Sequence, residues 1–326
     1  MYKESRDTIP LENEFMLSGP NSAGMTTAVF HAFNTVITLQ SYDNKELCSS
    51  AFVCAQSECR RFERLFSRTL PHSDISRLNS SSGMEIEIHA DTYLLLKKAQ
   101  YYCKESQGAF DITIGSVVRL WDFHDGKLPD SNNLKAALDH VNWENLELRQ
   151  DRSVSGKQYF ARLIDPHAAL DVGGIAKGYI ADSLARQLVA AGLVSFLINL
   201  GGNVVTRGLK PDNSPWRIGI QDPRKKDGIL GAIEVCNASA VTSGVYERCF
   251  EKDGAFYHHI LDPKTGFPAK TDVAGVTVVA EQSIDAEGFS TTLLALGIER
   301  GLDFVKNHPE IHAYFVNSEG RVISSQ

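Results

Sequence analysis

The chain has 326 residues, of which 43% are hydrophobic and 22% are charged, as in an ordinary globular protein, so wholesale disorder is excluded. This length suits one large domain or two closely packed ones. The net charge of −7 argues against sequence-independent binding of nucleic acid, which normally requires a basic protein. No stretch approaches the ~18 consecutive apolar residues of a membrane span.

The first 24 residues are polar and aperiodic, and they predict a flexible N-terminal tail before a single domain over residues 25–326. They contain no apolar stretch typical of a signal peptide and no cysteine-led lipoprotein site, which favours a cytoplasmic protein. The six cysteines form no CxxC pair, so we expect buried free thiols rather than a zinc site or a disulfide framework.

The predicted elements of the first half are one strand and two helices. Near-alternating β-branched and aromatic residues over 28–39 predict the strand. Apolar residues spaced three and four apart predict a helix over 44–67. A second helix is expected over 92–106, with Asp91 as its N-cap and Gly108 after its end.

The second half predicts a mixture of both element types. Helices are expected over 182–191 and 287–296, strands over 196–199, 216–221, 229–235 and 275–280, and a closing hairpin over 314–316 and 321–323. Because helices and strands alternate without strict βαβ repetition, the order favours an α+β fold over a doubly wound parallel sheet.

A glycine-rich turn at 170–179 is the first candidate site. Gly173 and Gly174 precede a helix, and Lys177 lies in its first turn. Backbone N–H groups at such a helix start bind anions, and the lysine adds positive charge. The spacing matches neither G-x-G-x-x-G nor a Walker A loop, and an ordinary strand-to-helix turn with a surface lysine is the alternative.

Two adjacent histidines form the second candidate. His258 and His259 precede a turn rich in proline and glycine over 262–268. In a strand their side chains point to opposite faces, so at most one of them faces a pocket. A neutral histidine suits general base catalysis near neutral pH. The alternative is a half-buried histidine beside a hairpin.

Two further segments carry polar or aromatic side chains. Glu287, Ser290 and Thr291 lie three and four residues apart and would share one helix face. One carboxylate with two hydroxyls suits Mg²⁺, which keeps several waters, although a solvated polar helix face is the alternative. The aromatic residues around 108–123 would stack on a flat ring or fill the core.

Taken together and in order, these segments resemble the ApbE-type FAD:protein FMN transferases. The matching pieces are residues 66–79, 108–115 (GAFDITIG), 170–182 (LDVGGIAKGYIAD), 198–203 (INLGGN), 243–248 (SGVYER), 259–268 (HILDPKTGFP) and 291–297 (TTLLALG). The resemblance runs from about residue 25 to near the C-terminus, so it assigns residues 25–326 to one domain of this type.

The resemblance implies a fold, a reaction and partners. The fold is an α+β flavin-transferase fold of the T-fold-like type, with largely antiparallel sheets packed with helices. Members bind FAD with Mg²⁺, for which Mn²⁺ is the alternative, break the pyrophosphate and attach FMN through a phosphoester bond to Ser or Thr of a target flavoprotein, and AMP leaves. The partners are therefore FAD and an acceptor flavoprotein subunit, without nucleic acid and without a membrane span.

The resemblance also implies site residues. FAD contacts carried over by motif are Phe33, Thr69, Ala109, Phe110, Asp111, Asp171, Lys177 and Ile260. Metal ligands are the backbone carbonyl of Gly174 and the side chains of Glu287, Ser290 and Thr291, and the base is His259.

The chain departs from the family pattern at three points. It has Phe33-Asn34-Thr35 where the family usually has Met-Gly-Thr, and Asn203 after Gly201-Gly202 where the family has aspartate. Glu287 replaces an aspartate metal ligand and is one methylene longer. Two alternatives to the transferase stay open: a metal-dependent FAD pyrophosphatase with water as nucleophile, and a non-catalytic flavin-binding protein.

Overall fold

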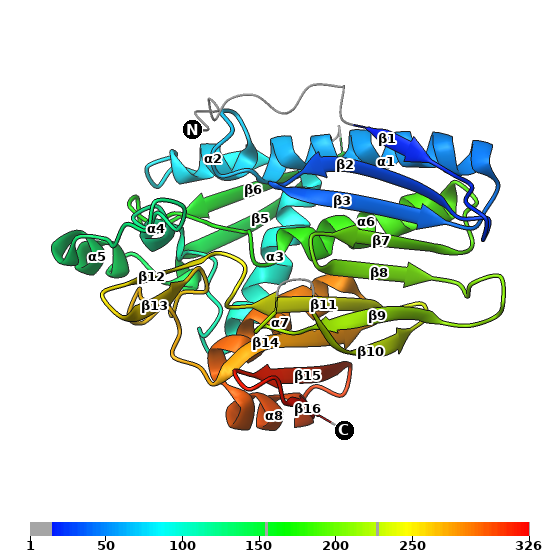
Figure 1. Ribbon diagram of the computed structural model, residues 1–326. Coiled ribbons are helices and arrows are strands. Elements are labelled where there is room, and N and C mark those ends of the chain that lie inside the picture. Colours follow the sequence, from blue (N-terminus) through cyan, green and yellow to red (C-terminus); the bar gives the residue numbers. More distant parts are fainter. Residues whose placement is uncertain (1–14, 154–155, 226–227, 326) are drawn as a thin grey trace.

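The computed structural model describes residues 15–153, 156–225 and 228–325, and its main feature is a nine-stranded sheet (Figure 1). The strands lie in the order β1 (Met16–Ser18), β2 (Thr26–Ala32), β3 (Thr35–Ser41), β7 (Phe196–Leu200), β8 (Asn203–Arg207), β11 (Ser239–Gly244), β14 (Val273–Ala280), β15 (Ile311–Asn317) and β16 (Val322–Ser324). Every neighbouring pair in this sheet is antiparallel.

Three smaller sheets surround it. One has the order β4 (Ile86–Ile88), β6 (Gly156–Leu163), β5 (Leu146–Ser153). The other two are the hairpins β9 (Trp216–Gln221) with β10 (Ile229–Val235), and β12 (Cys249–Lys252) with β13 (Ala255–His258). All of these pairs are antiparallel too, so the predicted α+β fold with largely antiparallel sheets is confirmed.

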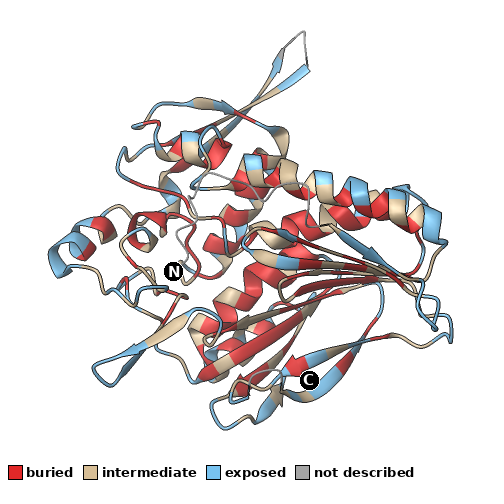
Figure 2. Cartoon of the chain, turned by 45° about the horizontal axis from the view of Figure 1, so that its top comes forward, coloured by how far each residue is buried: buried red, intermediate tan, exposed pale blue. Residues whose placement is uncertain are grey.

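Four helices pack on the large sheet: α1 (Lys45–Phe66), α6 (Ala176–Ala190), α7 (Ser283–Leu296) and α8 (Ile298–Lys306). The short α2 (Asp74–Asn79) and the longer α3 (Ala90–Glu105) pack on the sheet of β4, β5 and β6, and the 3₁₀ helix η2 (Trp143–Asn145) contacts α3. Helix α4 (Gly115–Val118) packs on α5 (Ser131–Leu138). Helix α1 packs on β2, α6 on β8, and α7 on β11, β14 and α6 (Figure 1). Figure 2 shows the buried residues gathered where these helices meet the sheet. Among the described residues, no helix is long and apolar enough to cross a membrane.

The strand predicted over 28–39 is wrong in one respect, because the structure divides it into the hairpin β2–β3. The turn residues Phe33 and Asn34 have φ of 54° and 58°, the left-handed pair that a two-residue hairpin needs. Phenylalanine rarely adopts this conformation, so composition gave no turn signal. The Phe33 N–H donates to Glu63 Oε1 at 2.6 Å, which holds the turn against α1.

Several other boundaries differ from those predicted. The N-cap of α3 is His89, whose Nδ1 accepts from the Asp91 N–H at 3.1 Å, so the prediction of Asp91 as the cap is wrong. Helix α6 begins six residues earlier than predicted and α7 four residues earlier. Of the segment predicted as a tail, residues 1–14 lie outside the described residues, while β1 pairs with β2. All six cysteines are free, but Cys54 and Cys236 are exposed rather than buried.

Helices α6 and α7 approach closely at Gly178. A Cβ added there would lie 2.7 Å from both Ile284 Cα and the carbonyl oxygen of Ser283, and 3.0 Å from Glu287 Cβ. The absence of a side chain at this position therefore sets the distance between the two helices and brings Glu287 against α6.

We expect Gly178→Ala to destabilise the protein by about 1–3 kcal/mol, because overpacking outweighs the better helix propensity of alanine. The measurement is the midpoint of urea unfolding. Gly231→Ala is the matched control, since a Cβ at Gly231 meets nothing within 4 Å. Equal midpoints for the two variants would show that the helices separate without cost.

Candidate functional site

The N-terminal end of α7 is fixed to α6 by a carboxylate. Asp182 of α6 accepts hydrogen bonds from the backbone N–H groups of Ser283 at 2.8 Å and Ile284 at 3.0 Å. A carboxylate at a helix N-terminus satisfies donors that have no partner within the helix, and it also interacts favourably with the helix dipole. Together with the close approach at Gly178, this contact fixes the next turn of α7, which carries Glu287.

Glu287 is buried and makes two charged or polar contacts. Its Oε1 forms an ion pair with Lys177 Nζ in the first turn of α6, and its Oε2 accepts a hydrogen bond from Asn203 Nδ2 at the start of β8. A buried carboxylate needs such partners, since leaving it unpaired costs several kcal/mol. The candidate metal ligand and the candidate phosphate-binding lysine therefore lie together.

The other predicted metal ligands lie on the same helix and on the turn before α6. A Cβ added to Gly174 would lie 3.6 Å from Thr291 Oγ1, so this turn and α7 are adjacent. The buried Ser290 hydroxyl lies 2.9 Å from Ser243 Oγ on β11 and donates to the carbonyl oxygen of Glu287 at 3.0 Å. Thr291 thus lies against the glycine turn, whereas Ser290 bonds within the protein.

The predicted flavin contacts at Phe110 and Asp171 border the same turn. The Phe110 ring lies 3.1 Å from the position of a Gly174 Cβ, and Asp171 Oδ1 accepts from the Gly173 N–H at 2.8 Å. Asp171 also pairs with Arg68 at 3.1 Å, which brings the loop after α1 to this turn. Thr69 lies in that loop, and its hydroxyl is 3.2 Å from Ser67 Oγ.

Three other predicted flavin contacts lie on other segments, although the loop of Asp111 is joined to the turn by the hydrogen bond from the Asp171 N–H to the Ile112 carbonyl oxygen at 2.8 Å. Asp111 accepts from the Thr113 N–H at 2.8 Å, from Thr113 Oγ1 at 2.6 Å and from the Trp143 N–H at 3.1 Å, so its carboxylate stabilises its own loop and joins it to η2. Burial raises the pKa of Asp111. Phe33 occupies the β2–β3 turn, and Ile260 is buried directly after the histidine pair.

The two histidines have different surroundings: His258 is the last residue of β13, and His259 follows the strand. His258 is buried, its Nε2 lies 3.2 Å from the carbonyl oxygen of Ala269, and it lines a large cavity. Burial, followed by the charge of Arg248 and smaller effects that include Lys177, lowers the pKa of His259 to about 3. His259 is therefore neutral, and its buried Nδ1 has no hydrogen-bond partner among the described residues.

Three residues near the site had no role in the sequence-based prediction. Asn203 was noted only as a departure from the family, and its contact with Glu287 joins residues 84 positions apart. Glu247 and Arg248 belong to a matched segment: Glu247 Oε1 lies 3.9 Å from the position of a Gly202 Cβ, and the Arg248 carbonyl oxygen accepts from the His259 N–H at 3.0 Å. Two exposed charges after a strand are typical of any surface turn, so only the tertiary structure connects them with the site.

Two cavities differ in their relation to this site. The larger, about 1300 Å³, is lined by residues that include Ala109, His258, Phe267, Lys270 and Arg300. Ala109 lines this cavity and precedes Phe110, whose ring packs on Gly174, so one short segment connects the larger cavity with the glycine turn.

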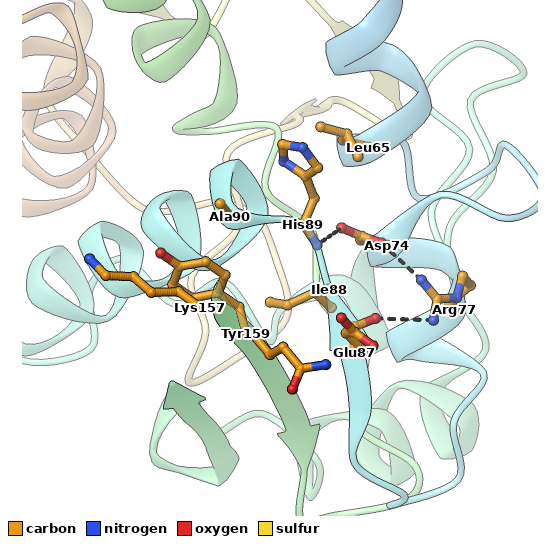
Figure 3. A pocket seen from close by; sticks show the side chains of 10 residues that line it. Leu65, Asp74, Arg77, Glu87, Ile88, His89, Ala90, Lys157 and Tyr159 are labelled. Carbon is orange, nitrogen blue, oxygen red and sulfur yellow. Dashed lines mark hydrogen bonds and ion pairs between the residues drawn. The ribbon is translucent and has the colours of Figure 1, made fainter. Parts of the chain in front are cut away.

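The smaller cavity, about 580 Å³, contains none of the predicted site residues (Figure 3). Its buried Asp74 accepts from Arg77 at 3.0 Å and from the His89 N–H at 2.8 Å, and Arg77 also donates to the carbonyl oxygen of Glu87 at 3.1 Å. These polar groups hold one another, so we assign no chemistry to this cavity.

Comparison with known proteins identifies the family. The ApbE family model matches residues 33–315. Relatives named FAD:protein FMN transferase include one from Treponema pallidum, 36% identical over 277 residues that cover 81% of this chain and 76% of the relative. Another, from Klebsiella pneumoniae, is 32% identical over 303 residues that cover 92% and 90%.

Solved structures agree in fold. The crystal structure of the ApbE protein from Thermotoga maritima superposes with a TM-score of 0.81 at 28% identity, covering 92% of this chain and 96% of that one. The apo form of the flavinyl transferase ApbE from Pseudomonas stutzeri gives 0.80 at 26% identity, covering 97% and 96%. The chain therefore belongs to the ApbE family, as its motifs predict, and the names of its relatives confirm the prediction of an enzyme.

Proposed function

We propose that this member of the ApbE family is an FAD:protein FMN transferase that attaches FMN to a serine or threonine of an acceptor flavoprotein. The acceptor hydroxyl oxygen forms a bond to the FMN phosphorus of FAD, the pyrophosphate P–O bond breaks, and AMP leaves. The hydroxyl proton passes to a base. The observation that carries this proposal is the buried pairing of Lys177 with Glu287 next to the Gly174 turn. His259, whose buried Nδ1 has no partner among the described residues, as is also true of His258, is the candidate base.

His259 is the base in this proposal. A hydroxyl has a pKa far above neutrality, so its attack needs a proton acceptor. The ring nitrogen is neutral and has no partner among the described residues, so a proton can be accommodated there. Its lowered pKa makes it a weak base in the free protein, and the negative phosphates of bound FAD would raise that pKa. The positive charges of Arg248 and, to a smaller extent, Lys177 lower the pKa of His259, so Lys177 lies within electrostatic range of the ring.

The turn before α6 would hold the phosphates. Among the described residues no side chain caps the α6 N-terminus, although the Ala176 N–H already donates to the Val172 carbonyl oxygen at 2.8 Å, so the later donors of the first turn are the ones that would bind an anion. Lys177 adds a positive charge in the first turn, and Asp171 stabilises the turn through the Gly173 N–H. Phe110 and the loop of Thr69 border the turn and would contact the flavin nucleotide.

The donors near Glu287 fit a divalent cation of the Mg²⁺ type. The predicted set is one carboxylate, two hydroxyls and the Gly174 carbonyl, all of them oxygen atoms, and the structure brings the Gly174 turn against Thr291. Bound there, a cation would supply charge stabilisation to the pyrophosphate. No cluster of three or more His, Cys, Asp or Glu residues able to hold a metal occurs in the described part of the chain, so the set depends on hydroxyl and carbonyl oxygens.

The experiment that tests the function is incubation of the protein with FAD, Mg²⁺ and candidate acceptor proteins, followed by intact mass measurement. A gain of one FMN phosphoester on the acceptor, with release of AMP, supports the transferase. Release of FMN and AMP without acceptor modification would replace it with an FAD pyrophosphatase. Tight FAD binding without turnover would replace it with a flavin-binding protein.

We expect the protein to bind FAD, and Lys177→Gln to weaken that binding by roughly 10-fold or more, because a charge-assisted contact to phosphate is lost. The measurement is titration of FAD fluorescence with and without Mg²⁺. Lys97→Gln, which removes an exposed charge from α3, is the control and should bind FAD like the wild type. Unchanged FAD fluorescence at high concentrations of wild-type protein would contradict the assigned pocket.

A further inference from the structure

Asn203 lies at a point where its side chain has little freedom. It starts β8 directly after the Gly201-Gly202 turn, and Asn203 and Glu287 are both buried. A Cβ at Gly201, whose φ is 58°, would lie 2.3 Å from Thr35 Oγ1, so the turn packs tightly against β3. Asn203 also pairs with Leu200 of β7 and with Val241 of β11, so the backbone that carries it is held from both sides.

The amide of Asn203 is also fixed in orientation. Ser283 Oγ donates to Asn203 Oδ1 at 2.7 Å, and the Ser283 backbone is itself bonded to Asp182. Because the oxygen is occupied by a hydroxyl donor, the NH₂ group faces Glu287 Oε2. A neutral amide donates to this carboxylate without adding a charge, whereas an ionised carboxyl at this position has no proton to donate.

The two oxygens of Glu287 thus have partners of different kinds. Oε2 is held by a short, buried side chain on a strand, while Oε1 is held by the ammonium of Lys177, which is half-buried on a long flexible stem. A cation that binds this carboxylate displaces the flexible partner more easily than the rigid one. Oε1 is therefore the oxygen open to exchange.

We propose that Asn203 is a positioning residue that keeps Glu287 Oε2 hydrogen-bonded. Glu287 then binds a divalent cation through Oε1 alone, and the cation replaces Lys177 as the partner of that oxygen. This inference rests on the proposed function, in which a cation binds at Glu287. A carboxylate restricted to one oxygen suits the small octahedral shell of Mg²⁺ or Mn²⁺, whereas Ca²⁺ often takes both oxygens. The exchange also frees Lys177 for the phosphates of FAD.

The test measures Mn²⁺ and Ca²⁺ binding to the full chain by isothermal titration without FAD. Asn203→Leu keeps the side-chain size but removes the donor, and we expect it to weaken Mn²⁺ binding by roughly 10–100-fold, as is usual for partners that orient metal ligands. Ca²⁺ binding should fall less, because Oε2 becomes available. Lys177→Met should strengthen Mn²⁺ binding, because the competing ammonium is gone.

Ser283→Ala is a second variant, which removes the hydroxyl that orients the Asn203 amide but keeps the amide itself. It decides the test where Asn203→Leu fails to fold. We expect it to weaken Mn²⁺ binding too, by less than Asn203→Leu does. Wild-type affinity for both ions in Asn203→Leu, or in Ser283→Ala where the first does not fold, would overturn the positioning role. Unchanged or weaker Mn²⁺ binding in Lys177→Met would overturn the exchange. Wild-type protein that binds no Mn²⁺, or Glu287→Gln that binds it normally, would instead contradict the cation site of the proposed function.

Discussion

Replacing His259 by glutamine should lower the rate of FMN transfer by roughly 10²–10⁴-fold, the usual contribution of a general base. FAD affinity should change little, because the proposed task of His259 is to accept the acceptor proton rather than to hold the nucleotide. The measurement is single-turnover transfer to an acceptor protein, followed by intact mass, together with FAD titration of the same variant.

The pH dependence of the wild type provides an independent check on His259. Its pKa is lowered to about 3, so the free protein keeps this group neutral far below the ~6.5 of an ordinary histidine. We therefore expect kcat/KM to show no loss from this group between pH 7 and about pH 5. Phosphates bound near Lys177 would offset part of the positive charge that lowers the pKa of His259. The pKa in the FAD complex should therefore be higher, and the acid limb of the kcat profile should lie at higher pH than that of kcat/KM.

His258→Gln is the matched control, because this buried neighbour has its Nε2 at 3.2 Å from the Ala269 carbonyl oxygen. It should retain most of the transfer rate once folding is verified by thermal unfolding. A His259→Gln variant as fast as the wild type, or a well-folded His258→Gln variant equally slow, would remove His259 from the mechanism.

Local periodicity predicted the parts of the fold whose signal lies within one segment. The helix at 44–67 matches α1 with Asn44 as its N-cap, and the strands at 216–221 and 229–235 match β9 and β10. The β2–β3 turn was missed because Phe33 adopts a left-handed conformation that tertiary contact with Glu63 supports. The start of α6 was placed late because Gly178 weakens the helix signal, although the packing of α7 requires a glycine there.

The candidate site was predictable residue by residue but not as an arrangement. Lys177 and Glu287 were each singled out from their own segments, and their family resemblance gave them roles. Their ion pair joins residues 110 positions apart, and no sequence pattern in either segment predicts it. The same holds for Asn203, whose buried contact depends on β8, α6 and α7 meeting at one point.

Replacing Glu287 by glutamine should lower Mg²⁺-dependent FMN transfer by roughly 10²–10³-fold, which corresponds to the several kcal/mol that charge stabilisation by a metal supplies. Phosphoryl transfer leaves a protein mainly positioning and electrostatic stabilisation to provide. The amide keeps the shape of the side chain but loses the charge that attracts a cation and pairs with Lys177. The measurement is the transfer rate at several Mg²⁺ and Mn²⁺ concentrations, with EDTA as the metal-free reference.

Glu287→Asp separates charge from length, because it keeps the carboxylate and removes one methylene. It should retain metal-dependent transfer, or raise it, whereas Glu287→Gln should not recover at any metal concentration. Since a longer carboxylate fits the strict octahedron of Mg²⁺ less well than the more tolerant shell of a larger ion, we expect the wild type to accept Mn²⁺ readily.

Asp285→Asn is the control, because the Asp285 carboxylate pairs with Lys98 at 3.4 Å and with Tyr102, both of them on α3. Transfer that survives EDTA, or a Glu287→Gln variant as active as the parent, would show that this carboxylate holds no catalytic metal. Activity gained by Glu287→Asp from an inert parent would show that the natural protein binds flavin without transferring it.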